Sequence, residues 1–329
     1  MNICILGAGA LGSAIGGALA EAGAAVTLVT RNAAHVAAIR HGGLRLRAGA
    51  AAGVAVPERR VAVRAQTDAL ALGVMDLVIV LVKSFHTREA LQAARHLVGP
   101  RTVVMSLQNG LGHEDILADV VGRAQVMAGK TYVGGVLLEP GLIQASIAGK
   151  ETLIGELDGS ISTRVLAIAA VFRDAGLAIT LSENIVGAMW DKLLVNVATG
   201  ALSGISGLTY GALYQVPEIE ATALAAVDEA MAVARAAGIT LRTREPRQAW
   251  DLAAAGLPAD FKTSMLQSLE KGSMTEIDFI NGAVVRHGQR WGVPTPINQT
   301  LVAGIKGIEH RLQRAALPQV PDPHRTITP

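Results

Sequence analysis

The sequence constrains its own fold most strongly at a glycine-rich turn near the N-terminus. Gly7, Ala8, Gly9, Ala10, Leu11 and Gly12 directly follow the apolar run Ile3–Leu6 and open a helical pattern. In this strand–turn–helix order the first glycine permits a tight turn, the second lets the backbone approach a pyrophosphate, and the third lets the helix pack on the strand. The N-terminus of the helix offers N–H groups and a partial positive charge to phosphates. A chain rich in Ala and Gly can produce the motif by chance, but its context predicts that these six residues bind a dinucleotide.

The residues after the second predicted strand indicate which dinucleotide is bound. That strand, Ala25–Thr30, ends at Arg31, and no Asp or Glu occurs between Glu21 and Glu58. An NAD site usually carries an acidic residue here, which bonds the ribose 2′-hydroxyl. A carboxylate would repel a 2′-phosphate, whereas a guanidinium can bind it in a bidentate way. Although Arg31 could be a solvated surface residue, the sequence predicts NADP(H), with Arg31 as a ligand of the cofactor.

Two further apolar strands bring candidate residues to the same edge as the glycine turn. The run 76–82 is followed by Lys83, and the run 102–107 is followed after one residue by Asn109. Such continuous apolar runs are typical of strands buried on both faces of a parallel sheet. The carboxyl ends of those strands face the ligand crevice of an open α/β sheet. We therefore expect Lys83 and Asn109 to bind the cofactor, although Asn109-Gly110 could be only a turn dipeptide.

The pattern changes from alternating strands and helices to helices alone near residue 182. Before that point, further strands are expected near 125–133, 141–145, 151–154 and 177–181, with a helix at 163–175 and short β-like pieces at 44–47 and 54–56. After it, helical patterns cover about 185–199, 217–237, 258–270, 275–291 and 296–316. The predicted fold class is therefore α/β, with an N-terminal Rossmann dinucleotide-binding domain at residues 1–182 and an all-helical C-terminal domain at 183–317. The proline-rich residues 318–329 are interpreted as a tail.

Composition argues against several other classes of protein. A chain of 329 residues is long enough for two domains, and its net charge of +2 is too small to indicate a nucleic acid or an anionic membrane as partner. The single cysteine, Cys4, cannot form an internal disulfide, which fits a reducing cytoplasm. The N-terminal segment lacks the basic start of a signal peptide, and the longest apolar run is too short for a membrane span. No metal-ligand spacing occurs among the eight dispersed histidines, so we expect no metal site. The cysteine content and the lack of a signal peptide or membrane span predict a cytoplasmic location.

Polar residues in the helical half supply the candidate catalytic groups. Lys192 and Asn196 lie four residues apart in one predicted helix and so share a face, and Ser264 and Glu276 follow in later segments. Together with the features above, these residues resemble the ketopantoate reductase family (2-dehydropantoate 2-reductases). The resemblance spans residues 1–315 in consistent order, and its matching pieces are Gly7–Gly12, Arg31, Lys83, Asn109-Gly110, Lys192–Asn196, Ser264–Gln267 and Glu276–Gly282.

The resemblance implies an NADPH-dependent reduction of a 2-oxo acid to a 2-hydroxy acid, with ketopantoate as the leading substrate. It implies that Lys192 is a general acid toward the substrate carbonyl and that Glu276 orients that site. It also implies substrate contacts for Asn109, Lys192, Asn196 and Ser264. An ammonium group suits the first role, because hydride addition builds negative charge on the carbonyl oxygen.

Each of these assignments has a structural alternative. Lys192 could be a snorkelling helix lysine paired with a neighbouring acid, and Asn196 could be a polar contact between helices. Ser264 could be a helix-surface serine. Ser273-Met274-Thr275-Glu276 is also a capping-box pattern, so Glu276 could cap a helix, and the two roles could overlap.

Two positions depart from the family pattern and leave the substrate open. Gly200 stands where family members often carry an asparagine, and Tyr210 stands where some carry another asparagine that contacts substrate. Loss of amide groups could favour a bulkier 2-oxo acid, as in the related D-2-hydroxyacid (mandelate-type) dehydrogenases. A third reading is a non-catalytic NADP-binding sensor, against which Lys192 and Glu276 argue because nucleotide binding needs neither. The sequence also leaves a homodimer open.

Overall fold

The computed structural model describes residues 1–48 and 58–316, and its contacts divide the chain into two units. The first comprises Met1–Leu193 and Gly238–Arg242, and the second comprises Leu194–Ala237 and Thr243–Pro329. The division falls inside the long helix α6 (Ile185–Ser206). The predicted strand at 54–56 and the predicted tail lie outside the described residues.

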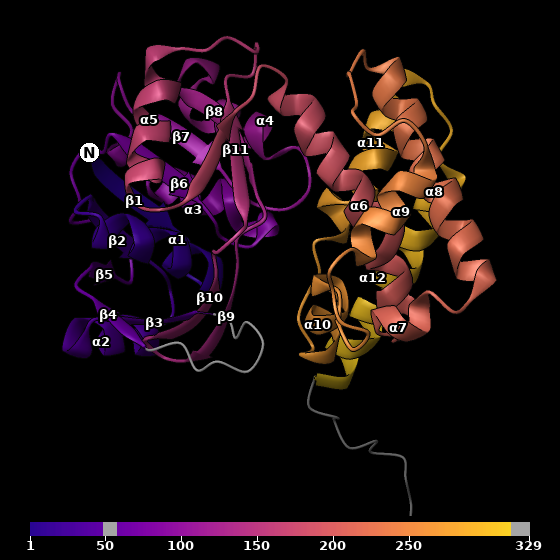
Figure 1. Ribbon diagram of the computed structural model, residues 1–329, viewed down its shortest axis with the longest axis horizontal. Coiled ribbons are helices and arrows are strands. Elements are labelled where there is room, and N and C mark those ends of the chain that lie inside the picture. Colours follow the sequence, from indigo (N-terminus) through magenta and orange to yellow (C-terminus); the bar gives the residue numbers. More distant parts are fainter. Residues whose placement is uncertain (49–57, 317–329) are drawn as a thin grey trace, which may run out of the picture. The chain divides into compact units, whose positions relative to one another are not determined.

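The first unit is built on an eight-stranded sheet with the order β12-β11-β8-β7-β6-β1-β2-β5 (Figure 1). All neighbouring strands are parallel except β8 and β11. The part from β5 to β8 has the strand order 3-2-1-4-5-6 of a Rossmann fold, which confirms the predicted fold class. The strands are β1 (Asn2–Leu6), β2 (Ala25–Val29), β5 (Arg64–Gln66), β6 (Leu77–Val80), β7 (Val103–Ser106), β8 (Val126–Thr131), β11 (Glu151–Gly155) and β12 (Ala178–Leu181).

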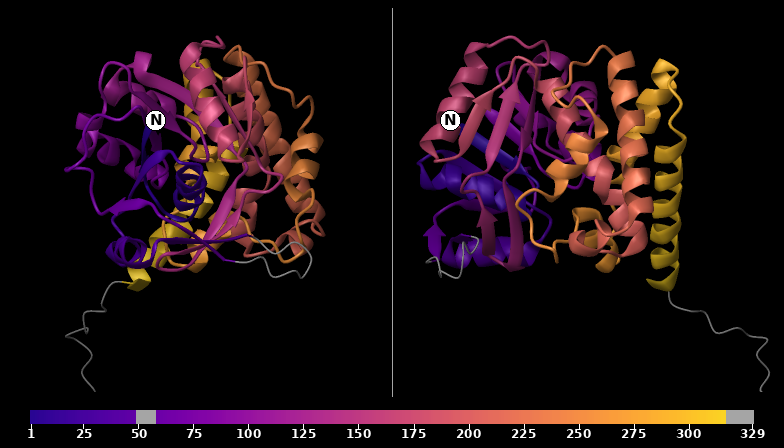
Figure 2. Two further views of the ribbon diagram at one scale, coloured as in Figure 1. Left: turned by 60° about the vertical axis from the view of Figure 1, so that its left-hand side comes forward. Right: turned by 45° about the vertical axis from the view of Figure 1, so that its right-hand side comes forward.

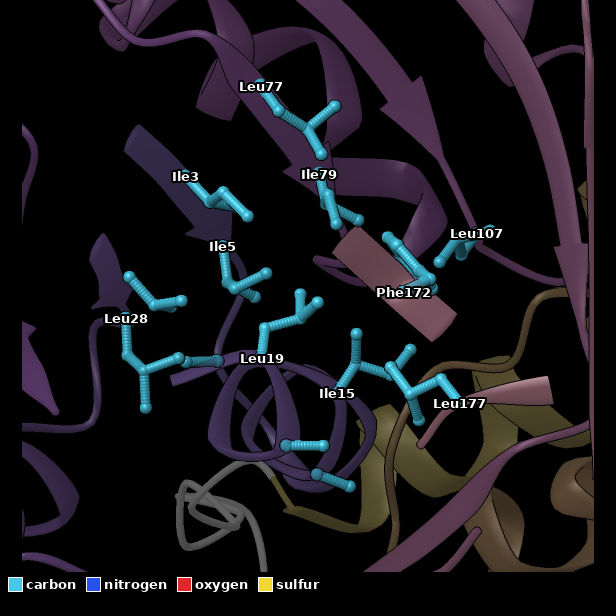
Figure 3. Packing of buried hydrophobic residues seen from close by; sticks show 14 of the residues in the cluster. Ile3, Ile5, Ile15, Leu19, Leu28, Leu77, Ile79, Leu107, Phe172 and Leu177 are labelled. Carbon is cyan, nitrogen blue, oxygen red and sulfur yellow. The ribbon is translucent and has the colours of Figure 1, made fainter. Parts of the chain in front are cut away.

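Both faces of this sheet carry apolar side chains, and helices cover both faces. Ile3 and Ile5 of β1 belong to a core with Ile15 and Leu19 of α1, whose side chains face them in Figure 3. Cys4, between the two isoleucines, belongs to a separate core on the opposite face, formed with α3 and α4. The helices of this unit before α6 are α1 (Ala10–Glu21), α2 (Ala33–Gly42), α3 (Thr87–Ala93), α4 (His113–Val121) and α5 (Thr163–Asp174).

A second, four-stranded sheet packs on the other side of α1. Its order is β4-β3-β10-β9. Glycines let α1 approach both sheets: a Cβ on Gly16 would lie 2.5 Å from the Leu28 side chain of the large sheet, and one on Gly17 would lie 2.8 Å from the Leu44 side chain of the small sheet. The strands are β3 (Leu44–Ala48), β4 (Arg59–Val61), β9 (Gly134–Glu139) and β10 (Leu142–Ser146). The sequence did not indicate β9, since its consecutive leucines and valine are exposed and do not alternate.

The second unit is entirely helical over the residues described. Long helices α8 and α12 run side by side, with α11 packed against both (Figure 2). Their cores consist largely of small residues, since α8 buries four alanines together with valines and a methionine. The helices are the C-terminal part of α6, then α7 (Tyr210–Leu213), α8 (Pro217–Ala236), α9 (Pro246–Ala254), α10 (Ser264–Glu270), α11 (Asn281–Trp291) and α12 (Pro296–Ala316).

Two helix starts differ from prediction. The helix expected from 258 begins at Ser264, because Thr263 is its N-cap and its side chain accepts a hydrogen bond from the Leu266 amide at 3.2 Å. The helix expected from 275 begins at Asn281, after a one-turn helix at Ile277–Phe279. Helix α9 was not predicted, although a proline at its first position is a typical start signal.

Helix α6 is long and apolar enough to cross a membrane by composition alone, with a mean hydropathy of 1.2 in its most apolar window. That window is 72% buried within the protein itself. A buried apolar helix of this kind is also found in the cores of soluble proteins, so its composition does not by itself indicate a membrane span.

Candidate functional site

The glycine turn is held between the carboxyl ends of three neighbouring strands. The amides of Gly7 and Ala8 both donate to the Val29 carbonyl at the end of β2, each at 2.9 Å. Gly7 has φ of 108°, and a Cβ there would lie 2.2 Å from the amide nitrogen of Val82, just past β6. No side chain fits at this position, so the first glycine is required by the turn and by its neighbour strand.

The other two glycines have different surroundings. A Cβ on Gly12 would lie 2.4 Å from the Gly7 carbonyl oxygen, so this glycine lets α1 pack on the turn. A Cβ on Gly9 would have no atom of residues 1–48 or 58–316 within 4 Å. Gly9 is also the N-cap of α1, where no side chain caps the helix and no acidic residue occupies its first turn. The chain therefore leaves both space and uncapped N–H groups beside Gly9, an arrangement that fits a phosphate group.

Arg31 follows β2 at the same edge of the sheet. Its side chain is exposed and makes no hydrogen bond or ion pair with residues 1–48 or 58–316. The next residue, Asn32, starts α2, since its side chain accepts a hydrogen bond from the His35 amide at 3.1 Å. The backbone at Arg31 is thus fixed while its guanidinium remains available to a ligand.

Lys83 and Asn109 lie in the loops after β6 and β7. The side chain of Gln108 joins these two loops by hydrogen bonds. The Gln108 amide group donates to the Val82 carbonyl at 2.7 Å and to the Thr87 hydroxyl at 2.8 Å. Lys83 is exposed, and Asn109 is partly buried just before the left-handed Gly110, which has φ of 95°. Because β6 and β7 are parallel neighbours, both residues lie on the edge that carries the glycine turn and Arg31.

Lys192 reaches this same edge from α6. Its Nζ donates to the Thr131 carbonyl oxygen at 2.5 Å, and Thr131 is the last residue of β8, which pairs with β7 in parallel. The Lys192 ammonium also lies 5.4 Å from the centroid of the Tyr132 ring. An acceptor carbonyl and an aromatic face both favour a charged ammonium group. The first unit therefore places the glycine turn, Arg31, Lys83, Asn109 and Lys192 along one edge of the sheet.

Lys130 and Tyr132 belong to this neighbourhood and were missed in the sequence. Lys130 is only 8% exposed, and its Nζ lies 3.2 Å from the Tyr132 hydroxyl oxygen. Burial lowers the pKa of Lys130, an effect that the nearby Asp191 opposes, and burial raises the pKa of Tyr132. A lysine inside an otherwise apolar strand was the signal that could have identified this pair.

The remaining predicted site residues belong to the second unit. Asn196 lies on α6 one turn before Gly200, and a Cβ at Gly200 would make an ordinary contact of 3.6 Å with Met265. Met265 follows Ser264, which is exposed at the start of α10. The pairing of α6 with α10 thus places Asn196 and Ser264 in neighbouring parts of this unit.

Glu276 lies in a segment that α12 anchors. The amide and hydroxyl of Thr275 both donate to the buried Glu309 carboxylate at 2.7 Å, and the Ile277 amide donates to the Thr275 hydroxyl at 3.2 Å. Lys306 bonds Asp278 at 2.5 Å and lies 3.2 Å from Glu309. These contacts fix the backbone on both sides of Glu276. The capping-box interpretation is wrong for this segment, because no helix begins directly after Ser273. Glu276 is instead the N-cap residue of the one-turn helix Ile277–Phe279, and its side chain makes no capping hydrogen bond there.

Tyr210 is part of an aromatic core in the second unit. It is 7% exposed, its hydroxyl lies 3.1 Å from that of Thr199, and its ring centroid lies 5.0 Å from that of Phe261. Its hydrogen-bonding group is therefore already satisfied within the protein. Gly200 leaves more room than an asparagine would, since a Cβ there would already contact Met265.

A Rossmann unit with a glycine turn and a lysine on one sheet edge, followed by an all-helical unit, defines a class of nicotinamide-dinucleotide oxidoreductase. Comparison with known families narrows the class. The family described as "Ketopantoate reductase PanE/ApbA" matches residues 3–159, and its C-terminal family matches residues 184–309. The chain belongs to the ketopantoate reductase family.

Curated relatives and solved structures agree with this membership. The chain is 34% identical over 305 residues to the 2-dehydropantoate 2-reductase of Halobacterium salinarum, which covers 92% of this chain and 96% of that protein. A PanE/ApbA family ketopantoate reductase from Ralstonia eutropha JMP134 is 35% identical with a TM-score of 0.85, over 95% of this chain and all of that one. A D-mandelate dehydrogenase solved with NADH and anilino(oxo)acetate is 27% identical with a TM-score of 0.84, over 95% of this chain and 100% of that one.

Proposed function

We propose that this chain is an NADPH-dependent reductase that converts a 2-oxo acid into a 2-hydroxy acid, with ketopantoate to pantoate as its main reaction. Family membership supports the reaction class. The single observation that carries the proposal is the Lys192 ammonium on the Thr131 carbonyl at 2.5 Å, on the same sheet edge as the glycine turn. A fixed ammonium beside a dinucleotide site is the arrangement that carbonyl reduction needs.

The bound NADPH supplies a hydride to the carbonyl carbon of the substrate. The uncapped start of α1 beside Gly9 suits the pyrophosphate, and the unpartnered Arg31 suits the 2′-phosphate. Lys83 and Asn109, in the two loops joined by Gln108, are proposed to complete the cofactor site.

Lys192 is proposed to donate a proton to the carbonyl oxygen as charge builds on it. Its positive charge stabilises that oxygen, and the bond to Thr131 keeps the ammonium in one place before substrate arrives. A pre-placed donor costs no reorganisation during the reaction. Glu276 is proposed as the residue that orients this chemistry, and Asn109, Lys192, Asn196 and Ser264 as substrate contacts, on the family resemblance.

The test is a steady-state panel of 2-oxo acids, including ketopantoate and phenylglyoxylate, in which NADPH oxidation is measured with the purified protein. Ketopantoate is expected to have the highest kcat/KM. Because Gly200 removes an amide that could bond a polar substrate, the expected value is roughly 10- to 100-fold below that of a site retaining it. Highest efficiency with phenylglyoxylate would instead favour a mandelate-type enzyme.

Lys192→Ala separates catalysis from cofactor binding. We expect kcat to fall roughly 100-fold or more, while the Kd of NADPH stays near that of the wild type. Lys150→Ala is the matched control, because Lys150 is an exposed lysine on the turn before β11 and should change neither value. Wild-type turnover in Lys192→Ala would show that another group is the acid. NADPH binding with no turnover of any 2-oxo acid by the wild type would indicate a sensor.

A cytoplasmic location and a homodimer are further proposals that rest on the sequence. Size-exclusion chromatography with light scattering tests the second, and fractionation of the native host tests the first.

A further inference from the structure

Two ammonium groups share one aromatic ring at the end of β8. The Nζ of buried Lys130 lies 5.1 Å from the centroid of the Tyr132 ring, and the Nζ of Lys192 lies 5.4 Å from it. Both ammonium nitrogens therefore lie within 5.4 Å of the centre of one ring. The Lys130 Nζ also lies 3.2 Å from the Tyr132 hydroxyl oxygen, whereas the Lys192 Nζ donates a hydrogen bond to the Thr131 carbonyl oxygen.

We propose that Tyr132 is a positioning residue for Lys192, and that Lys130 holds the Tyr132 ring in the orientation this requires. The proposal rests on the proposed function, in which Lys192 is the proton donor. In it, the ring face favours the charged form of Lys192 and confines its ammonium, while the Lys130–hydroxyl contact prevents the ring from turning away.

The surroundings of the ring explain why it needs an anchor. Tyr132 is 43% exposed, so packing covers only part of its ring. Its backbone is fixed, because its amide donates to the Glu151 carbonyl at 2.9 Å and so extends the pairing of β8 with β11. Only the side chain remains to be held, and Lys130 is the residue that contacts its hydroxyl.

Burying the ammonium group of a lysine costs free energy unless that group is paired or hydrogen-bonded. Lys130 points to the same side of β8 as Tyr132, since the two are separated by one residue in the extended chain. An apolar residue at position 130 would fill the same space without this cost. The contact with the Tyr132 hydroxyl is therefore the feature that distinguishes lysine from an apolar residue here.

Several charged groups face this cluster within the first unit. Asp191 and Glu151 stabilise positive charge on Lys130, whereas Arg242 opposes it. The Asp191 carboxylate is itself held by the Arg242 amide, at 3.1 and 3.2 Å from its two oxygens. Tyr132→Leu and Tyr132→Phe leave these three residues and Lys130 in place, so a change in the behaviour of Lys192 in those two variants can be assigned to the ring. Lys130→Met also removes a positive charge near Lys192, which by itself favours the charged form of Lys192.

The test compares variants that remove the ring with variants that remove only its anchor. Tyr132→Leu removes the aromatic face. Tyr132→Phe and Lys130→Met each keep the ring and break the hydroxyl contact. The main readout is the alkaline limb of the kcat–pH profile, measured with the 2-oxo acid that the wild type reduces best. Activity through a lysine acid falls as pH rises through its pKa.

Tyr132→Leu is expected to move this limb to lower pH by roughly half a pH unit or more, because a cation–π contact favours the ammonium by that order. Tyr132→Phe keeps the ring but frees it to turn, so it should move the limb less than Tyr132→Leu does and lower kcat by about threefold, an order set by loss of one weak positioning contact. Lys130→Met should lower kcat by a similar factor, while its limb moves to higher pH or stays in place because a neighbouring positive charge is lost. The double variant Lys130→Met/Tyr132→Phe should have a kcat no lower than that of either single variant.

A second readout needs no turnover. The 13Cε resonance of Lys192 can be followed by NMR in the cofactor-free protein, which has only seven lysines, and assigned by its loss in Lys192→Ala. Tyr132→Leu should lower the pKa measured in this titration, and Tyr132→Phe should lower it less. If the wild type reduces no 2-oxo acid, this titration still decides whether the ring acts on Lys192.

The proposal is overturned if Tyr132→Leu lowers only the melting temperature and leaves both titrations of Lys192 unchanged, since the ring would then merely fill space. It is overturned equally if Tyr132→Phe moves the limb as far as Tyr132→Leu does. It is also overturned if the losses of kcat in Lys130→Met and Tyr132→Phe multiply in the double variant.

Discussion

Gly9→Ala is the substitution that best separates cofactor binding from folding, because Gly9 is the glycine of the turn that packing does not require. A Cβ there would touch no atom within 4 Å in the part of the chain that the structure describes, and its φ of −75° is ordinary for alanine. Restricting the unfolded chain stabilises by about 0.4–1 kcal/mol, whereas alanine is a poorer N-cap than glycine by a similar amount. The two effects nearly cancel. We therefore expect the cofactor-free protein to melt within about 2 °C of the wild type.

NADPH binding should respond quite differently. The Cβ would occupy the space into which the pyrophosphate must come to reach the N–H groups of α1. Losing one hydrogen bond to a charged group costs about 1.5–3 kcal/mol, so the Kd of NADPH should rise roughly 10- to 100-fold. The assay is a fluorescence titration of NADPH, paired with thermal melting of the cofactor-free protein.

Gly12→Ala is the control, because its Cβ would lie 2.4 Å from the Gly7 carbonyl oxygen and 3.0 Å from the Ile5 side chain. That overpacking should cost about 1–3 kcal/mol and lower the melting temperature by several degrees. Wild-type affinity for NADPH in Gly9→Ala would refute the reasoning, since the space beside Gly9 would then not be where phosphate binds. A large loss of melting temperature in Gly9→Ala would refute the packing argument.

Three further predictions follow from single residues. Arg31→Ala should raise the Kd of NADPH roughly tenfold or more while barely changing that of NADH, and equal affinity of the wild type for both cofactors in calorimetry would contradict this. Burial lowers the pKa of His35 below its ordinary 6.5, so the unfolded chain binds a proton that the folded chain does not; urea unfolding should show stability falling as pH drops below about 6.5, with a shallower fall in His35→Gln. Burial raises the pKa of the Cys4 thiol to about 12, so it should react with a thiol reagent only on unfolding, and rapid labelling of the folded protein would disprove this.

The first unit could be predicted well because its signals are local. The strand before Gly7, the continuous apolar runs of β6 and β7, and the absence of acid near Arg31 each depend on a few adjacent residues. The edge on which the candidate residues lie then follows from the parallel order of the strands. The small sheet was harder, since pairing of β10 with β3 joins residues nearly one hundred positions apart, and β9 is exposed along most of its length.

The details of the site depended on contacts that no local pattern encodes. The bond from Lys192 to the Thr131 carbonyl joins residues that are 61 positions apart, and the Thr131 side chain plays no part in it. Glu276 illustrates the same limit, because its segment is fixed by Glu309 rather than by a helix cap. Sequence patterns identified both residues but could not show what holds them.

The glycine turn shows why a motif for binding is also a motif for folding. Gly7 and Gly12 are needed to fit the turn against β6 and to seat α1 upon it, and Gly16 and Gly17 are needed to pass that helix between two sheets. Only Gly9 is left to serve the ligand. A chain could therefore keep most of the motif for packing alone, and its presence is weaker support for cofactor binding than the empty space beside Gly9. Because that space opens toward the uncapped first turn of α1, folding itself produces a site that suits a phosphate.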